Sequence, residues 1–268
     1  MIGKGYSDGP FGQLHWRMLV PEQKVTRPDL YCLHPAPFSG LAFTTIMPFL
    51  ASGRRVIAPD FPGHGGSDRF RPDPGIADYA EAMEAVMEDL SGTAPVDIMG
   101  FHSGNLVAAE MAAENSGRVR SLVLIDVPAF DPQARARLQP AVAGRFAITA
   151  DLRCLEKPWD LGMTKRVDSQ GIDRSFEMFT EQLRHGAAMN AAFHAAFTYD
   201  VEGRLPLLSR PALILATQSG LLEATRRAAS LIPSARLVER LDIKRAVLDE
   251  AAEKTATEIL HFLDEDIR

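Results

Sequence analysis

The stretch Asp97-Ile98-Met99-Gly100-Phe101-His102-Ser103-Gly104-Asn105-Leu106-Val107 decides how this chain folds. Its first residues belong to a short apolar run of the kind that forms a buried strand. A helical pattern over Asn105–Asn115 follows at once. Gly100 and Gly104 stand two places either side of His102, and glycines are typical of sharp turns. The pattern therefore predicts a tight strand-to-helix turn with His102 at its tip.

Short apolar runs alternate with helical patterns along much of the remaining chain. The predicted strands are Leu30–Leu33, Arg55–Ala58, Val96–Met99, Leu122–Ile125, Ala212–Ala216 and Arg236–Val238. The predicted helices are Gly40–Ala51, Ile76–Leu90, Asn105–Asn115, Glu223–Leu231 and Asp249–Leu263. Partial alternation over Leu14–Val20 adds an opening antiparallel strand. The order predicts the α/β class, with a mainly parallel sheet and helices on both faces.

One interval, Ala129–Leu205, interrupts this alternation, because it contains helical patterns and prolines but no convincing strand. We interpret it as a helical insertion, so that residues 1–128 and 206–268 form the core and residues 129–205 form a separate lid. The later part of the insertion is rich in aromatic residues, which either pack among themselves or line an apolar pocket. They are Phe176, Phe179, Phe193, Phe197 and Tyr199.

Four segments of this chain resemble the α/β-hydrolase superfamily, in order and at the usual spacing. His34–Gly40 looks like the family's oxyanion loop, with Pro35 in place of a glycine, and Asp60–Asp68 looks like the loop after the next strand. The turn around His102 looks like the nucleophile elbow. The last segment is the closing strand Ala212–Ala216 with the helix, strand and helix after it. The resemblance implies the α/β-hydrolase fold of about eight strands, with a helical lid at the insertion.

The register of the elbow decides which residue occupies the nucleophile's place. The family pattern is Gly-x-nucleophile-x-Gly, and the flanking residues are small because neighbouring chain segments approach closely. Gly100 and Gly104 centre this pattern on His102. Centring it on Ser103 would place the bulky Phe101 at a small position. We therefore expect His102, rather than Ser103, at the tip.

The other two triad positions also depart from the family. The family's acid usually follows the strand that is Ala212–Ala216 here, where Gly220 stands instead. Glu223 is the nearest carboxylate, and it is typical of a helix N-terminus. Arg245 stands about where the family's histidine would be, and an arginine stays protonated at neutral pH. The resemblance thus implies a degenerate triad.

Asp126, at the end of strand Leu122–Ile125, offers a replacement acid, because some family members carry their acid at this strand end. There it would orient His102 and stabilise its imidazolium form, giving a His–Asp dyad for proton transfer. The alternative is that Asp126 only caps the following loop. His102 itself is interpreted first as a base, with the roles of nucleophile or pocket wall left open.

By resemblance, the oxyanion hole consists of the backbone N–H groups of Ala36 and Ser103. The nearby pocket candidates are His34, Phe38 and Phe101. For His34 a purely structural role in its loop is the alternative. The sequence predicts no metal site and no cofactor, since no histidines stand at ligand spacing.

Composition limits the classes of function. The chain has 268 residues, a formal net charge of −6 and no dense cluster of basic residues, which argues against nucleic acid as a partner. Two cysteines fit a reducing compartment. We see no leader peptide and no run of apolar residues that could span a membrane. The expectation is a cytoplasmic protein with a small-molecule substrate, and its oligomeric state stays open.

The leading hypothesis is a hydrolase or lyase that acts on a small, largely apolar substrate, with His102 as acid and base and Asp126 as its partner. Hydrolysis by activated water, or a lyase, decarboxylation or isomerisation step, would suit these groups. Two alternatives remain. The chain is either a catalytically inactive ligand-binding protein or receptor, or an ordinary serine hydrolase that uses Ser103.

Overall fold

The computed structural model describes residues 1–69, 73–141 and 146–265. An eight-stranded sheet forms its centre, in the order β1-β2-β4-β3-β5-β6-β7-β8. The pairs β1·β2 and β2·β4 are antiparallel, and all other neighbours are parallel. The strands are β1 (Gly3–Gly9), β2 (Gly12–Leu19), β3 (Leu30–Leu33), β4 (Val56–Pro59), β5 (Val96–Phe101), β6 (Val119–Ile125), β7 (Ala212–Thr217) and β8 (Ala235–Arg240). The predicted mainly parallel sheet is confirmed.

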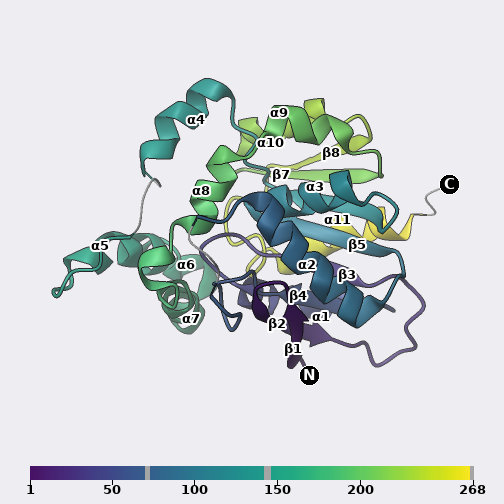
Figure 1. Ribbon diagram of the computed structural model, residues 1–268, viewed down its shortest axis with the longest axis horizontal. Coiled ribbons are helices and arrows are strands. Elements are labelled where there is room, and N and C mark those ends of the chain that lie inside the picture. The colour runs from purple at the N-terminus through teal and green to yellow at the C-terminus, as the bar shows by residue number, and fades with distance from the viewer. Residues whose placement is uncertain (70–72, 142–145, 266–268) are drawn as a thin grey trace.

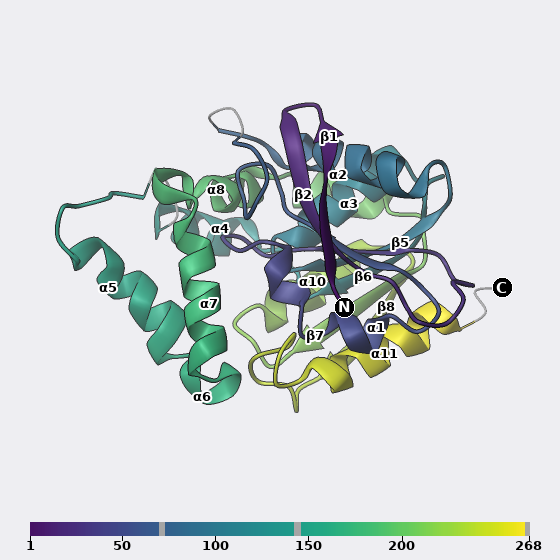
Figure 2. The ribbon, with the colours of Figure 1, turned by 90° about the horizontal axis from the view of Figure 1, so that it is seen from below.

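Helices cover both faces of the sheet (Figures 1 and 2). On one face lie α2 (Ile76–Ser91), α3 (Gly104–Glu114) and α10 (Leu222–Leu231), which share one apolar core with the sheet. On the other lie α1 (Met47–Leu50) and α11 (Ala252–Asp264), which share a second core. Every residue of β3, β4 and β7 is buried, because each of these strands has helices above and below it.

Two elements differ from the sequence-based expectation. Strand β1 was not predicted, because its sequence, GKGYSDG, has no apolar alternation and is held by its pairing with β2. The single helix predicted over residues 40–51 is instead a 3-10 turn, Gly40–Phe43, followed by the four-residue α1. Proline stands in the first turn of α1, where the missing N–H has no partner to lose.

The insertion between β6 and β7 contains helices and no strand within its described residues. Its α-helices are α4 (Pro132–Leu138), α5 (Arg153–Trp159), α6 (Val167–Gln170), α7 (Ile172–Leu183), α8 (Ala191–Thr198) and α9 (Val201–Arg204). In Figure 1, α4 to α8 lie to one side of the sheet. Across the described part of the chain, no helix combines the length and apolar character needed to cross a bilayer.

Candidate active site

The turn between β5 and α3 has the geometry of a nucleophile elbow. His102 is its tip and adopts a left-handed backbone conformation with φ of 49°, whereas Ser103 already has helical dihedrals and precedes α3. A Cβ atom on Gly100 would lie 2.6 Å from the Cα of Asn105, and one on Gly104 would lie 2.0 Å from the Leu33 carbonyl oxygen. The glycines are therefore required on both sides, and the register predicted from the sequence is confirmed.

Asn105 braces this turn against the neighbouring strand, a role that sequence reasoning missed. Its side-chain amide donates to the Ile125 carbonyl at 2.7 Å and its carbonyl accepts the Ile125 N–H at 3.0 Å. The His102 N–H also donates to the Ile125 carbonyl, at 3.1 Å. These bonds fix the elbow to the end of β6, directly before Asp126. The sequence signal for this role was an asparagine directly after the turn glycine, at the start of a mostly apolar helix.

A cavity of about 800 Å³ lies between the elbow and the insertion. His102, Phe101 and Asp126 line its core side, and Met178 and Phe193 line it from the insertion. His102 therefore projects into a space enclosed by both parts of the chain, as the sequence predicted. Of the five aromatic residues considered for a pocket wall, Phe193 is a lining residue. Phe197 instead stacks on Phe130.

Three non-glycine residues with positive φ line this one cavity. They are His102, Asp126 with φ of 50° and Ala246 with φ of 47°. Each such residue costs on the order of 1–3 kcal/mol, so the conformation persists only where the surrounding structure imposes it. Strain of this kind tends to gather at functional sites, and its convergence here marks this cavity as the candidate site.

The His102 imidazole is uncharged at neutral pH. Burial lowers its pKa to about 4, the Asp126 carboxylate acts in the opposite direction, and the Arg166 guanidinium adds to the lowering. The N-terminus of α3, which starts two residues later, also disfavours a positive charge at this place. A neutral imidazole in an enclosed cavity is able to accept a proton from a bound molecule.

Asp126 is hydrogen bonded to Thr217 rather than to His102. One carboxylate oxygen accepts the Thr217 N–H at 2.9 Å, and the other accepts the Thr217 hydroxyl at 2.7 Å. Asp126 is fully buried and links the ends of β6 and β7. It acts on the imidazole through its charge. The expected hydrogen-bonded His–Asp dyad is thus replaced by an electrostatic pair.

Ser103 faces the oxyanion loop instead of the cavity. Its hydroxyl accepts the Ala36 N–H at 2.7 Å, and Ser103 is 7% exposed. It is absent from the described residues that line the cavity, whereas Ala36 is present. The Ala36 amide, expected as an oxyanion donor, therefore already has an intramolecular acceptor.

Two of the three residues predicted to lie near the pocket line the cavity, and the third does not. Phe38 and Phe101 line the cavity, as expected. His34 does not, because its ring is buried beneath the loop, where Nε2 accepts the Phe61 N–H at 2.9 Å and Nδ1 lies 3.1 Å from the Pro35 carbonyl oxygen. The structural alternative considered for His34 agrees with this geometry.

The remaining positions of the family triad hold no relay in this chain. Gly220, at the place of the acid, has no side chain, and its neighbour Ser219 lines the cavity together with Arg245, at the place of the histidine. Arg245 pairs with Glu250 at 3.4 Å. Among the described residues, no three His, Cys, Asp or Glu side chains converge as metal ligands.

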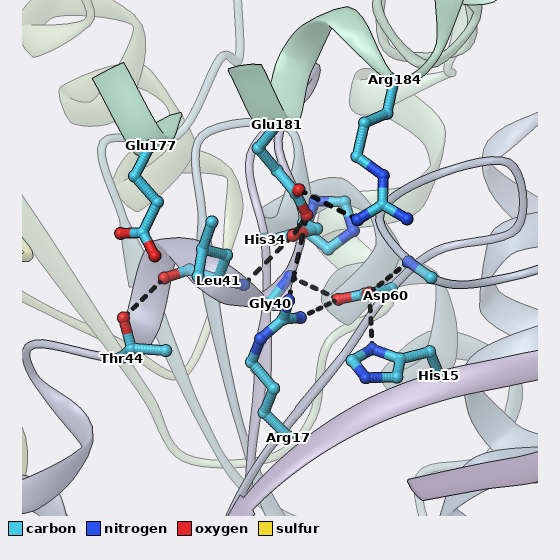
Figure 3. Close-up of polar contacts among 12 residues, drawn as sticks. His15, Arg17, His34, Gly40, Leu41, Thr44, Asp60, Glu177, Glu181 and Arg184 are labelled. Carbon is cyan, nitrogen blue, oxygen red and sulfur yellow. Dashed lines mark hydrogen bonds and ion pairs between the residues drawn. The ribbon is translucent and has the colours of Figure 1, made fainter. Parts of the chain in front are cut away.

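Polar contacts anchor the insertion above the core (Figure 3). Glu181 of α7 accepts a hydrogen bond from the Ser39 hydroxyl and lies 3.9 Å from the Arg17 guanidinium. Arg17 in turn pairs with Asp60 at 2.8 Å. Nearby, His185 Nδ1 lies 2.8 Å from the Gly63 carbonyl oxygen. These contacts hold the insertion against the core, so that the insertion covers the cavity.

Comparison with known proteins shows which fold this chain shares. A family profile described as alpha/beta hydrolase fold matches residues 28–151. The match covers strands β3 to β6, and the whole described chain has the α/β-hydrolase fold. An enol-lactonase from Burkholderia xenovorans superposes with a TM-score of 0.79 over 97% of this chain and 100% of its own, at 20% identity, so this likeness shows the fold alone.

Two curated relatives match this chain over part of their own length. A pimeloyl-[acyl-carrier protein] methyl ester esterase of Aromatoleum aromaticum is 33% identical over 128 residues, covering 47% of this chain and 48% of the relative. A haloalkane dehalogenase of Mycobacterium marinum is 32% identical over 141 residues, covering 50% and 44%. The chain thus spans about half the length of the curated relatives it matches.

Proposed function

We propose that this chain is a hydrolase in which the His102 imidazole acts as a general base without forming a covalent intermediate. The observation that carries the proposal is the left-handed backbone at His102, which holds an uncharged ring in the roofed cavity. Neither core packing nor helix propensity favours that conformation for a histidine.

In the proposed reaction, the imidazole accepts a proton from water while the water oxygen attacks the carbonyl carbon of an ester or lactone. The resulting imidazolium then returns the proton to the departing oxygen as the carbon–oxygen bond breaks. The negative charge of Asp126 stabilises the imidazolium between these steps. The N-terminus of α3 favours the negative charge that develops on the substrate oxygen.

Two findings support hydrolysis over the other reactions considered. The curated relatives that match part of this chain include an esterase and a dehalogenase. Cleavage by a base-activated water needs no nucleophilic side chain, which suits a site whose serine hydroxyl faces the oxyanion loop.

One observation favours a second candidate, a ligand-binding protein without turnover. Both the Ala36 N–H and the Asp126 carboxylate are satisfied by intramolecular partners, Ser103 and Thr217. A site that needs them for a substrate would first have to break these bonds. Tight binding with no turnover would select this candidate.

The experiment is a turnover screen with p-nitrophenyl esters and small lactones, followed by mass spectrometry of the intact protein during turnover. We expect hydrolysis with no acyl adduct on the protein, because the water attacks the carbonyl directly. In His102→Gly, turnover should fall by at least about 100-fold, the usual contribution of a general base. An acyl adduct that forms and decays at the turnover rate would refute the proposal.

A further inference from the structure

The charge of the cavity is opposite to that of the whole chain. Five cationic side chains and two carboxylates line it, although the chain carries a formal net charge of −6. The cations are Lys157, Lys165, Arg166, Lys244 and Arg245. A cavity for a wholly apolar substrate has no use for such an excess, because charged groups in it must be desolvated when the substrate binds.

Arg166 differs from the other four cations by its depth. It is half-buried, whereas the other four are exposed. Its guanidinium carbon lies 5.3 Å from the centre of the Phe38 ring, in the oxyanion loop. Its charge also acts on His102 across the cavity. Arg166 therefore lies deep in the cavity, within electrostatic range of the candidate base.

Within the described residues, no carboxylate pairs with Arg166. Its Nε donates to the Leu161 carbonyl at 3.2 Å, which satisfies one of its five N–H groups. Asp249, whose charge reaches Arg166, is engaged by Thr45, Gln170 and Arg174. By contrast, the neighbouring Lys165 pairs with Asp160 at 2.7 Å. A half-buried arginine without a carboxylate partner is suited to bind a planar anion through two parallel hydrogen bonds.

We propose that the cavity binds a small organic carboxylate, with the carboxylate on the Arg166 guanidinium and the rest of the molecule extending toward His102. This inference rests on the proposed function, since it names the substrate class of the same cavity. The substrate would then carry a free carboxylate in addition to the ester or lactone bond that is cleaved. The expectation of a largely apolar substrate is narrowed to an apolar chain with one charged end.

The test compares hexanoate with hexanamide, which share a chain and differ in charge, by isothermal titration calorimetry at pH 7 and 0.15 M salt. At that ionic strength, attraction to distant surface charges is largely screened. We expect the unsubstituted protein to bind hexanoate at least about tenfold more tightly than hexanamide, as a charge-assisted pair implies.

In Arg166→Gln the preference should fall to within about twofold, and Arg166→Lys should restore part of it. The matched control is Lys165→Gln, which removes the same charge from the adjacent lining residue and should keep the preference. Circular dichroism checks the fold of each variant. Equal binding of the two probes by the unsubstituted protein, or an unchanged preference in folded Arg166→Gln, would overturn the proposal.

Equilibrium binding separates this inference from the proposed function. His102→Gly should still prefer hexanoate, because the guanidinium remains. A preference that depends on Arg166 in a protein without turnover leaves the anion site standing and refutes the proposed hydrolysis. Turnover that depends on His102 with no preference for the anion refutes the anion site alone.

Discussion

The Ser103 hydroxyl accepts the Ala36 N–H at an N···O distance of 2.7 Å, and this bond joins the residue after the elbow tip to the oxyanion loop. A nucleophilic serine needs a base that takes its proton. In the described structure no imidazole nitrogen is hydrogen bonded to Ser103, and its hydroxyl lies outside the cavity lining. Ser103 is thus a structural residue at the position next to the nucleophile's place.

A fluorophosphonate probe should therefore fail to label the protein, since Ser103 is neither activated nor reachable from the cavity. The measurement is intact mass after incubation, with a known serine hydrolase treated in parallel as the positive control. Stoichiometric labelling that maps to Ser103 would restore the ordinary serine mechanism.

Replacing His102 by glycine should leave stability unchanged or raise it. Glycine adopts φ of 49° without strain, which recovers roughly 1 kcal/mol, and its greater freedom in the unfolded chain offsets part of that gain. The matched control is Ala246→Gly, another left-handed residue lining the cavity, which should behave alike in urea unfolding but keep turnover. A loss of more than about 1 kcal/mol in His102→Gly alone would mean that the ring itself stabilises the fold.

Asp126→Asn and Arg166→Gln should shift the pKa of His102 in opposite directions. The carboxylate raises that pKa and the guanidinium lowers it, so removing the first lowers the value further and removing the second raises it from about 4. Asparagine at 126 still accepts the Thr217 N–H, which preserves the fold. Nitrogen-detected NMR titration of the imidazole measures both shifts. Shifts of the same sign would show that these charges do not govern the imidazole.

A stack of buried histidines should make stability depend on pH. The His64 ring lies 4.4 Å from the His185 ring and 5.3 Å from the His34 ring, and burial lowers the pKa of all three, that of His34 to about 4. Below pH 6.5 the unfolded chain binds protons that the folded one does not, so stability falls as pH falls toward 4. For His34 alone the full loss is roughly 3 kcal/mol.

Urea unfolding between pH 7 and pH 4.5 measures this slope. Asp60 and Glu181 also face the stack and partly offset the effect of burial on His34 and His185. His64→Phe keeps a ring at the centre and should flatten the slope. His261→Gln, at an exposed position, should leave it unchanged. A slope that His64→Phe does not alter would place the pH dependence elsewhere.

Much of the fold followed from sequence pattern, because strands such as β3 and β7 are continuous apolar runs buried on both faces. The tip of the elbow followed from two glycines whose places admit no Cβ atom. What could not be predicted were side-chain partners. Nothing in the sequence indicates that Thr217 holds Asp126, because the two meet only when β6 and β7 pair.

The cationic character of the cavity was also invisible in the sequence. Lys157 and Arg166 belong to the insertion, whereas Lys244 and Arg245 follow β8, and only the folded chain brings them to one space. Composition shows a net negative chain, which argued only against nucleic acid as a partner. The charge of a cavity depends on which segments the fold brings together, and the net charge of the chain does not reveal this.

The most direct test of the account is a side-by-side measurement of kcat/KM for His102→Gly and Ser103→Ala on an ester that the unsubstituted protein hydrolyses. The account requires His102→Gly to lose at least about 100-fold, while Ser103→Ala stays within about threefold, because Ser103 takes no part in bond breaking. The reverse result, with Ser103→Ala inactive and His102→Gly active, would contradict the account.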